Sequence, residues 1–494
     1  MLSQFALLIL GFFSQRAMNL YMGAELVGMN GVISNVINIL SVTELGISTA
    51  IVYHLYGALA RKDEAEIASL MNLYRKAYHV FAVLVFAAGM AVLPFIHLFM
   101  KNNSYSLSYI RVLYAMWLVR TVLSYLLTYR KSLLIADQKE YIASITGLIL
   151  NVVSYLAIIL LVTWEQNYLL ALGIGTVTEV VLNIWISWYV EQKYPFLRQR
   201  RKEKSTSSLT KRIVRDLKSL FISRISEKML YCTDNLIISG FIGVGTVGRY
   251  ANYCMITQAI SNILTILANT IQPTVGDYFT EKNHQRNYEI LRQLTFGFFC
   301  IASVVSIGLF SLITPFVRDI WLGPSYELGW GITVFCIVVL LVRIMGLPLS
   351  LVMGVTGLFE KEKNVGASSA LLNLIVSLAL VKPYGMAGVL LGTLLSYLLQ
   401  ILYRYIIYFR DFLEMPGEAL RYAQDIGEYL AVIAGEVLLM QKIVPLVYGA
   451  GGMLLFCVCF LLCIAIPLLL DLVIFGRGWR LQSIITMVKG MRKA

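Results

Sequence analysis

Apolar runs of about 20 residues recur from the first residues of the chain almost to its end. A helix of that length crosses roughly 30 Å of hydrocarbon, and inside a bilayer only helices and closed barrels satisfy every backbone polar group. Only 14% of the 494 residues are charged, against about 25% in ordinary soluble domains. The chain is therefore predicted to be an all-α, polytopic membrane protein with about 14 transmembrane helices.

One long hydrophilic segment, Leu197 to Lys218, divides these runs into six before it and eight after it. The predicted spans lie near residues 2–22, 29–56, 77–100, 108–133, 141–163, 168–190, 219–242, 249–272, 291–317, 328–355, 364–382, 385–409, 427–448 and 451–475. We expect an N-terminal six-helix lobe at 1–190, a basic cytoplasmic connector at 191–218 and a second six-helix lobe at 219–410. Two further helices and a basic tail would occupy 411–494.

The net charge of +13 is the excess of 41 Lys and Arg over 28 Asp and Glu residues. The Lys and Arg residues lie mostly in the even-numbered loops between the predicted spans and in the C-terminal tail. Short basic loops mark the cytoplasmic side of a membrane protein, so both termini are predicted to be cytoplasmic. Nucleic-acid binders instead collect their charge on a soluble face, so no nucleic-acid partner is predicted. The connector run RQRRKEK is interpreted as a topology determinant in preference to a lipid site.

The stretch FIGVGTVGRY contains the glycine spacing of a dinucleotide-binding loop, a motif that has its mechanism only between a strand and a helix. A shift of 220 residues places Gly23 on Gly243 and Gly28 on Gly248, whereas the middle glycine is Glu25 in the other copy. The same alignment, moved by one residue, matches PFIHLFMKNNSYSL with PFVRDIWLGPSYEL. We therefore predict a tight helix connection within an internal repeat, and no nucleotide.

A repeat of six spans returns the chain to the side of the membrane where it started, so both copies have the same orientation. Two parallel six-helix lobes related by a pseudo-two-fold axis are a plan that occurs in transporters. Phosphate-loop, HExxH and GxSxG motifs are absent from the sequence, and the seven cysteines lack metal-ligand spacing. A transporter is predicted, with no enzymatic activity, metal or organic cofactor.

Ionisable residues inside predicted spans cost roughly 2.5–3.5 kcal/mol each on insertion scales, so each needs a partner, a water-filled cavity or a function. For the residues below, a cavity-lining role and a buried structural pair both remain open. Arg224 lies in the first turns of its helix, where an ion pair near the cytoplasmic interface is an equal alternative. The candidates are Arg16, Arg120 and Arg343, the acids Glu44, Glu179 and Asp234, and the secondary candidates Arg224, Asn235 and Gln15.

Three stretches carry a resemblance to a known family: VGMNGVISNVINILSVTELGISTAIVYHLYGALARKDEAEIASLMNLYRKAY, TDNLIISGFIGVGTVGRYANY and PFVRDIWLG. They resemble the polysaccharide repeat-unit flippases of the multidrug/oligosaccharidyl-lipid/polysaccharide exporter superfamily. This resemblance implies translocation of undecaprenyl-pyrophosphate-linked oligosaccharides across the bacterial cytoplasmic membrane, for surface polysaccharide biosynthesis. Membrane lipids, a polysaccharide polymerase and glycosyltransferases would be the partners.

Arginine suits a pyrophosphate because its guanidinium is always charged and forks onto phosphate oxygens. In our hypothesis the two lobes rock to give alternating access, and Arg16, Arg120 and Arg343 hold the pyrophosphate. Any one of Glu44, Glu179 and Asp234 would take up H⁺ or Na⁺. An ion-coupled drug or metabolite exporter of the same superfamily is the nearest alternative. A polysaccharide polymerase fits less well, because the sequence has no large loop predicted on the outer side.

Overall fold

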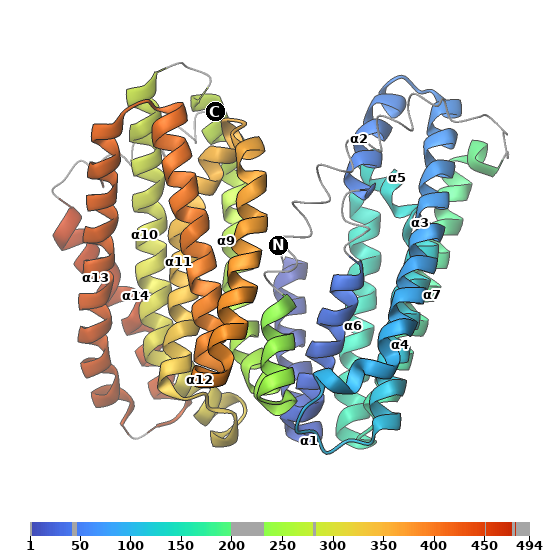
Figure 1. Ribbon diagram of the computed structural model, residues 1–494, viewed down its shortest axis with the longest axis horizontal. Coiled ribbons are helices and arrows are strands. Elements are labelled where there is room, and N and C mark those ends of the chain that lie inside the picture. Colours follow the sequence, from blue (N-terminus) through green and yellow to red (C-terminus); the bar gives the residue numbers. More distant parts are fainter. Residues whose placement is uncertain are drawn as a thin grey trace. The chain divides into compact units, whose positions relative to one another are not determined.

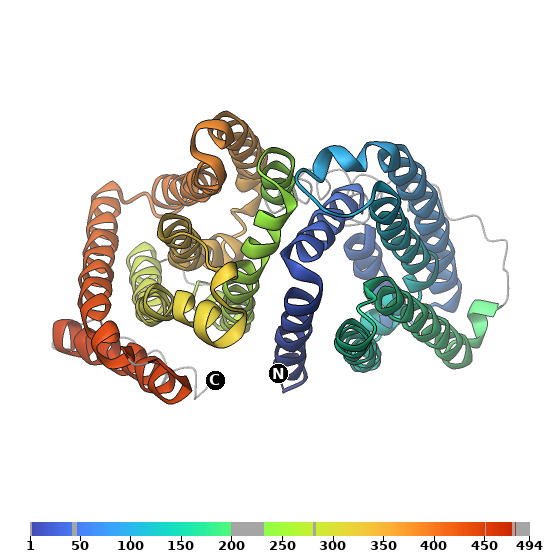
Figure 2. The ribbon, with the colours of Figure 1, turned by 90° about the horizontal axis from the view of Figure 1, so that it is seen from below.

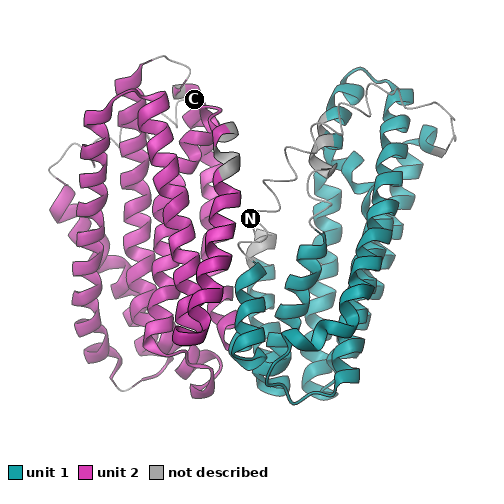
Figure 3. Ribbon diagram, viewed as in Figure 1, with its two compact units in different colours: residues 1–248 teal, residues 249–494 magenta. Residues whose placement is uncertain are grey.

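The computed structural model describes residues 2–41, 47–198, 232–279, 283–449, 451–476 and 480. Throughout these ranges the regular structure is helical, and no strand occurs in them (Figure 1). The predicted all-α architecture is confirmed. By contacts the chain separates into two compact units, Met1–Gly248 and Arg249–Ala494, which Figure 3 distinguishes by colour.

Unit 1 is a bundle in which α1 packs against α4 and α6, and α4 packs against α3 and α7. Its helices are α1 (Leu2–Leu40), α2 (Ile47–Ala60), α3 (Glu64–Val92), α4 (Leu107–Thr128), α5 (Lys131–Ala136), α6 (Glu140–Trp164) and α7 (Tyr168–Lys193), with short 3₁₀ segments η2 (Leu93–Phe99) and η3 (Pro195–Arg198). A helical segment at 232–241 and the first turn of α9 (Val244–Tyr278) also belong to this unit.

The elements of unit 2 are the rest of α9, α10 (His284–Pro315), the π-helix η4 (Phe316–Trp321), η5 (Pro324–Tyr326), α11 (Trp330–Val355), α12 (Phe359–Ile407), the π-helix η6 (Tyr408–Phe412), α13 (Pro416–Tyr448) and α14 (Met453–Phe475). The unit is built around α10 and α11. More than half of the apolar stretch of each of these two helices is buried, whereas only 17% is buried in α14. Figure 2 shows α13 and α14 at one edge of the unit, and both pack against α10.

Polar residues before the apolar runs start several of these helices. Asp63, Ser106, Asn167 and Asn283 each accept a hydrogen bond from the backbone N–H three residues later, at 2.9 to 3.3 Å. Such caps satisfy backbone donors that would otherwise lack a partner at a helix start. The caps of α4 and α7 lie where the predicted spans at 108 and 168 begin, whereas those of α3 and α10 start their helices well before the predicted 77 and 291.

Large apolar side chains cover the outside of the helices. Leu446 is 85% exposed, and Val473 and Leu454 are both 78% exposed. A soluble protein would not leave so many isolated from a core, whereas lipid accepts them. Ten helices among the described residues are long and apolar enough to cross a membrane. The chain is a multi-pass membrane protein.

Two predicted breaks between spans, at Gly23 in α1 and Gly385 in α12, are confirmed as points where two helices meet. The φ of Gly23 is 81° and that of Gly385 is 58°, so neither residue is helical. A left-handed backbone is easily adopted only by glycine, so each glycine lets the chain turn from one helix into the next. In α12 the two helices lie side by side, because the Ser396 hydroxyl donates to the Ser369 carbonyl at 2.8 Å. Gly243, the repeat equivalent of Gly23, also has a positive φ, at 142°.

The other repeated glycine pair lies at a close crossing of α1 with the start of α9. A Cβ added at Gly28 would overlap the carbonyl of Val244, and one added at Gly248 would overlap the carbonyl of Ala24. The two contacts are reciprocal, because Ala24 and Val244 are themselves related by the 220-residue shift. The backbones can approach this closely only where neither helix carries a side chain.

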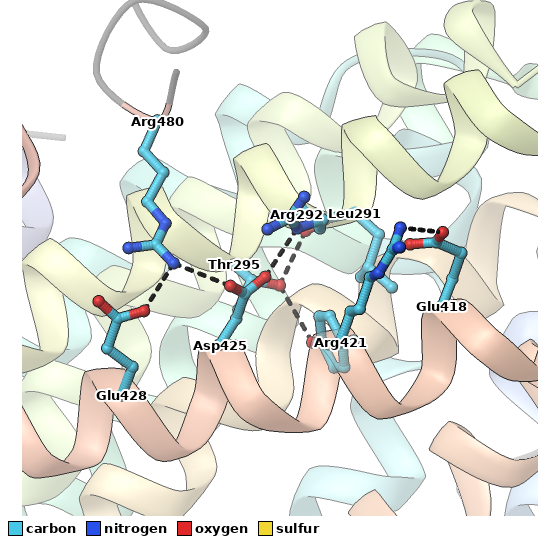
Figure 4. Close-up of polar contacts among 9 residues, drawn as sticks. Leu291, Arg292, Thr295, Glu418, Arg421, Asp425, Glu428 and Arg480 are labelled. Carbon is cyan, nitrogen blue, oxygen red and sulfur yellow. Dashed lines mark hydrogen bonds and ion pairs between the residues drawn. The ribbon is translucent and has the colours of Figure 1, made fainter. Parts of the chain in front are cut away.

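Unit 2 also contains an ion cluster, which we define as Arg292 of α10, Asp425 and Glu428 of α13, and Arg480 beyond α14 (Figure 4). The Nε of Arg292 lies 2.7 Å from one oxygen of Asp425, and an Nη of Arg480 lies 2.8 Å from the other. Arg480 also contacts Glu428 at 2.7 Å. The buried Asp425 therefore joins the two arginines and ties the segment after α14 to α10 and α13.

Candidate functional site

The structure brings two sequence-predicted residues together in unit 1. Arg120 lies in the middle of α4 and Glu179 in the middle of α7. The Nε of Arg120 donates a hydrogen bond of 2.7 Å to Oε2 of Glu179, and the two side chains are only 22% and 18% exposed. The buried structural pair that the sequence left open is thus formed, and its surroundings show what else the pair can do.

A cavity of about 340 Å³ opens beside this ion pair. Most of its lining side chains are polar, which is unusual between membrane helices because each polar group costs free energy in an apolar setting. The lining residues are Ser34, Ile37, Asn38 and Ser41 from the end of α1, Trp117, Arg120, Thr121, Ser124 and Tyr125 from α4, and Glu179 from α7.

Two further residues hold the arginine's aromatic neighbour in place. The indole N–H of Trp117 donates to Oδ1 of Asn30 at 2.8 Å, and the hydroxyl of Tyr168 donates to the same oxygen at 2.9 Å. The guanidinium carbon of Arg120 lies 5.5 Å from the centroid of the Trp117 ring, within cation–π range. Arg120 is therefore positioned by a carboxylate and a ring that is itself fixed.

Gly175, one turn before Glu179 on α7, makes room for the same guanidinium. A Cβ at Gly175 would lie 3.6 Å from Nη1 of Arg120 and 3.2 Å from the hydroxyl of Ser154. The second distance is tighter than side chains normally tolerate, so a larger residue would disturb the packing beside the ion pair.

The hydrogen-bonding capacity of Arg120 is only partly used. A guanidinium has five N–H donors, of which Nε serves Glu179. Within the described ranges, neither Nη group donates a hydrogen bond to the protein. Four donors thus remain for an anion, and forked donation is the geometry in which arginine binds phosphate oxygens. Hydroxyls, an amide and two aromatic rings in the lining can contact sugar.

The other cavity candidates lie elsewhere in unit 1. Arg16 is exposed on α1, and the neighbouring Gln15 is half-buried. The backbone carbonyl of Gln15 accepts a hydrogen bond of 2.8 Å from the side-chain amide of Asn19. In the helical segment at 232–241, Asp234 is buried, at 7% exposure, and Asn235 is half-buried. None of these four lines the cavity beside Arg120.

Arg343 is a residue of unit 2, on α11. Its guanidinium carbon lies 5.6 Å from the centroid of the Tyr397 ring on α12. Glu44 and Arg224 lie outside the described residues. A common pyrophosphate site for Arg16, Arg120 and Arg343 therefore stays a prediction.

Sequence reasoning missed most of the cavity because it started from ionisable groups and added only Asn235 and Gln15 from the uncharged polar residues. Asn30, Ser34 and Asn38 recur every four residues, which places them on one face of a helix. Trp117 and Ser124 are seven residues apart and share a face with Arg120 in the same way. Uncharged polar stripes at helical spacing inside apolar runs were the signal that could have identified this wall.

Comparison with known proteins gives a family and a fold. A family model described as polysaccharide biosynthesis protein matches residues 1–279, more than half of the chain. Among curated protein sequences, none matches. Many solved structures share the fold, as the following three illustrate.

The structure titled "Lipid II flippase MurJ, inward closed conformation" has a TM-score of 0.69 and 16% identity, and the match covers 96% of this chain and 98% of that one. An inward-facing multidrug-resistance MATE transporter of the MOP superfamily has a TM-score of 0.62 and 13% identity, covering 81% and 93%. The Vibrio cholerae MATE transporter VcmN has a TM-score of 0.53 and 11% identity, covering 84% and 98%.

At these identities the solved structures establish the fold of the chain, while the family model establishes its relationship. Both agree with the resemblance carried by the three sequence stretches. The chain is thus a multi-pass membrane protein with the fold of MOP-superfamily transporters, and it belongs to the family of polysaccharide biosynthesis proteins.

Proposed function

We propose that this protein is a flippase that moves undecaprenyl-pyrophosphate-linked oligosaccharide repeat units across the bacterial cytoplasmic membrane, for surface polysaccharide biosynthesis. The observation that carries the proposal is the cavity beside Arg120, which combines spare guanidinium donors with polar and aromatic walls in a member of the polysaccharide biosynthesis family. The pyrophosphate would bind the guanidinium and the sugars the cavity wall, while the lipid tail stays in the bilayer.

The ion pair supplies a way to couple binding to a second event. An anion that engages the Nη groups of Arg120 competes with Glu179 for the same positive charge. Glu179 would then be left with a weakened counter-charge inside the membrane, where an isolated carboxylate is unfavourable. Uptake of a proton or Na⁺ by Glu179 would relieve that cost, and release would restore the pair. This exchange gives alternating access a chemical step at which substrate and ion interact.

The decisive variants are Arg120→Ala and Arg120→Lys. A charge-assisted hydrogen bond contributes about 1.5–3 kcal/mol, so removing the guanidinium is expected to weaken binding of a purified pyrophosphate-linked lipid about 10- to 100-fold. Lysine keeps the charge but lacks the fork, so it should recover only part of the affinity. Surface polysaccharide in a host that depends on this protein should fall in parallel, at equal protein levels.

Arg130→Ala is the matched control. Arg130 pairs with Glu191 of α7 at 2.5 Å, a contact of the same kind that does not line the cavity. It should leave substrate affinity unchanged. Equal loss in both variants would mean that the α4 and α7 region needs its ion pairs for folding and that Arg120 has no special contact with substrate.

The drug-exporter alternative predicts a different ligand preference. Purified protein should bind the pyrophosphate-linked oligosaccharide in preference to a panel of lipophilic cations, since the cavity offers spare cationic donors to an anion. Preference for the cations, abolished by Glu179→Gln and unaffected by Arg120→Lys, would favour the exporter instead.

Depletion in the host separates the flippase from a polymerase. Loss of a flippase leaves lipid-linked repeat units facing the cytoplasm, whereas loss of a polymerase leaves them on the outer face. We further propose that a polymerase and glycosyltransferases act on either side of this step, and that both termini are cytoplasmic. Cysteine accessibility at the two ends of the chain in intact cells measures that orientation.

A further inference from the structure

Unit 2 contains two buried carboxylates that the proposed transport site does not use. Glu436 lies on α13 and is 3% exposed, and Asp471 lies on α14 and is 5% exposed. Each lies within the apolar part of its helix, in the sequences AVIAGEVLLM and IPLLLDLVIF. Their helices, α13 and α14, pack against each other and against α10. Acidic side chains in such positions are costly and need a compensating partner.

The compensation found in the structure is incomplete. The hydroxyl of Ser303 on α10 donates a hydrogen bond of 2.7 Å to Oε2 of Glu436. Within the described ranges, Oε1 of Glu436 and both carboxylate oxygens of Asp471 are fully buried and accept no hydrogen bond, and neither acid forms an ion pair there. The described residues therefore leave three of the four carboxylate oxygens uncompensated.

The groups facing the pair do not supply a positive charge. From α10, the Cys300 thiol interacts with both acids and Ser303 contacts one. Lys442, on α13, is exposed and is six residues beyond Glu436. The arginines of the ion cluster are taken up by Asp425 and Glu428.

An aromatic layer separates the acids from that cluster. Phe296 and Phe299 of α10 pack against Tyr429 of α13 and Phe475 of α14, with ring centroids 4.5 to 5.9 Å apart. The guanidinium of Arg480 covers the same layer, 5.2 Å from the Tyr429 ring and 4.8 Å from that of Phe475. Along α13 the 11 residues from Asp425 to Glu436 span about 16 Å, so the cluster does not neutralise the acids directly.

A buried carboxylate without a counter-charge is costly to ionise, because the charged form is poorly solvated there and the medium screens charge poorly. A proton on either acid removes that charge and its cost. A metal ion fits less well, since hard cations take six or more oxygen ligands and the described residues here offer fewer. In the described ranges, no three or more acidic, His or Cys side chains are placed so that they could hold a metal ion together.

We propose that Glu436 and Asp471 form a proton-binding site that holds at least one proton at neutral pH. The site lies in the pair of helices that the internal repeat does not include, and it is distinct from Arg120 and Glu179. Proton binding itself is independent of the transported substrate. Its use as a coupling site, with the proton gained and lost in each cycle, rests on the proposed transport function.

Infrared spectroscopy of the purified full-length protein tests proton binding directly. At pH 7 the wild type should show the carbonyl-stretch band of a protonated carboxyl group, and the band should be lost in the double variant Glu436→Gln/Asp471→Asn. Glu289→Gln, which neutralises an exposed carboxylate of α10, should leave the band unchanged. Identical wild-type and double-variant spectra in this region would overturn the proposal.

The single variants keep the test decisive should the double variant fail to fold. Glu436→Gln and Asp471→Asn each remove one of the two carboxyl groups, so the band should weaken or shift in the variant that removes the protonated one. A band that is unchanged in both single variants would exclude these two residues as the proton site.

Reconstituted vesicles then test the coupling role. A pH gradient should accelerate translocation of a pyrophosphate-linked oligosaccharide by the wild type but not by the double variant. Equal acceleration of both would overturn the coupling role and leave the infrared result standing. Absence of translocation by the wild type would instead refute the proposed function, which the spectrum does not depend on.

Discussion

Substitution of Gly28 tests the close crossing of α1 and α9, and Gly31 provides the control in the same helix. A Cβ at Gly28 would overlap the Val244 carbonyl and lie 2.9 Å from the backbone nitrogen of Gly248. A Cβ at Gly31 would come no nearer than 3.9 Å, to a methyl group of Val247. Both positions are helical, so alanine gains up to about 1 kcal/mol of helix propensity at either one.

The two variants should therefore move in opposite directions. At Gly28 the obstacle is backbone, which cannot rotate away, so the helices must separate at a cost of about 1–3 kcal/mol or more. Gly31→Ala has only an ordinary contact to make and should be as stable as the wild type or more stable. The propensity gain is common to both variants, so the expected difference in their unfolding free energies is the clash cost alone, about 1–3 kcal/mol or more.

Thermal unfolding of the detergent-solubilised protein, followed by fluorescence, measures this difference. Gly28→Ala should unfold well below the wild type, and Gly31→Ala at or above it. A Gly28→Ala protein that unfolds together with Gly31→Ala would refute the close crossing, because no other property of the two positions predicts a large difference.

Two further perturbations test polar contacts outside the cavity. Burial alone would raise the pKa of Asp137, but hydrogen bonds from Lys139 and a tyrosine outweigh it and hold the pKa below its ordinary value. This carboxylate therefore stabilises the fold above the unfolded pKa of about 3.9, and the benefit is lost as the pH falls through the folded pKa. The unfolding temperature of Asp137→Asn should lie below that of the wild type at pH 7, and the two should converge in acid. Glu165→Gln, which changes an exposed carboxylate, should unfold with the wild type at every pH. A difference between Asp137→Asn and the wild type that does not change with pH would contradict this linkage. Asp425→Asn removes the charge that joins two arginines in the ion cluster, and losing one partner of a buried ion pair costs about 3–5 kcal/mol. Limited proteolysis after α14 should accelerate because Arg480 is released. Unchanged cleavage would mean that other contacts hold Arg480.

The number and order of the helices could be predicted because length and hydropathy alone define a membrane span. Helix ends with polar caps, such as Ser106 and Asn167, were close to the predicted positions. The breaks at Gly23 and Gly385 were also predicted, because each glycine lies between two apolar runs, and the backbone is non-helical at both.

The candidate site was predictable only in part. That Arg120 has an acidic partner could be predicted, because burying either charge alone is costly. Which acid it pairs with could not be predicted, because Glu44 and Glu179 were equal candidates until the packing of α4 on α7 was known. The polar residues of α1 that line the cavity could not be singled out from the sequence. They are uncharged, and burying an uncharged polar group costs so little free energy that such residues also occur where they have no function.

The glycine-rich stretch that resembles a nucleotide loop has its explanation in the crossing of α1 with α9. A two-fold relation between 23–28 and 243–248 places repeat-equivalent residues opposite each other, as the contacts of Gly28 and Gly248 with Val244 and Ala24 show. Position 25 must then face position 245, and a Cβ at Gly245 would lie 3.7 Å from Cγ of Glu25. That is an ordinary contact, and the two copies differ there: one carries a carboxylate, which accepts the Ser104 N–H at 2.9 Å, and the other carries glycine. The middle glycine that completes the dinucleotide fingerprint therefore lies in the first turn of α9, opposite Glu25 at a helix crossing, where no strand precedes it in the described residues.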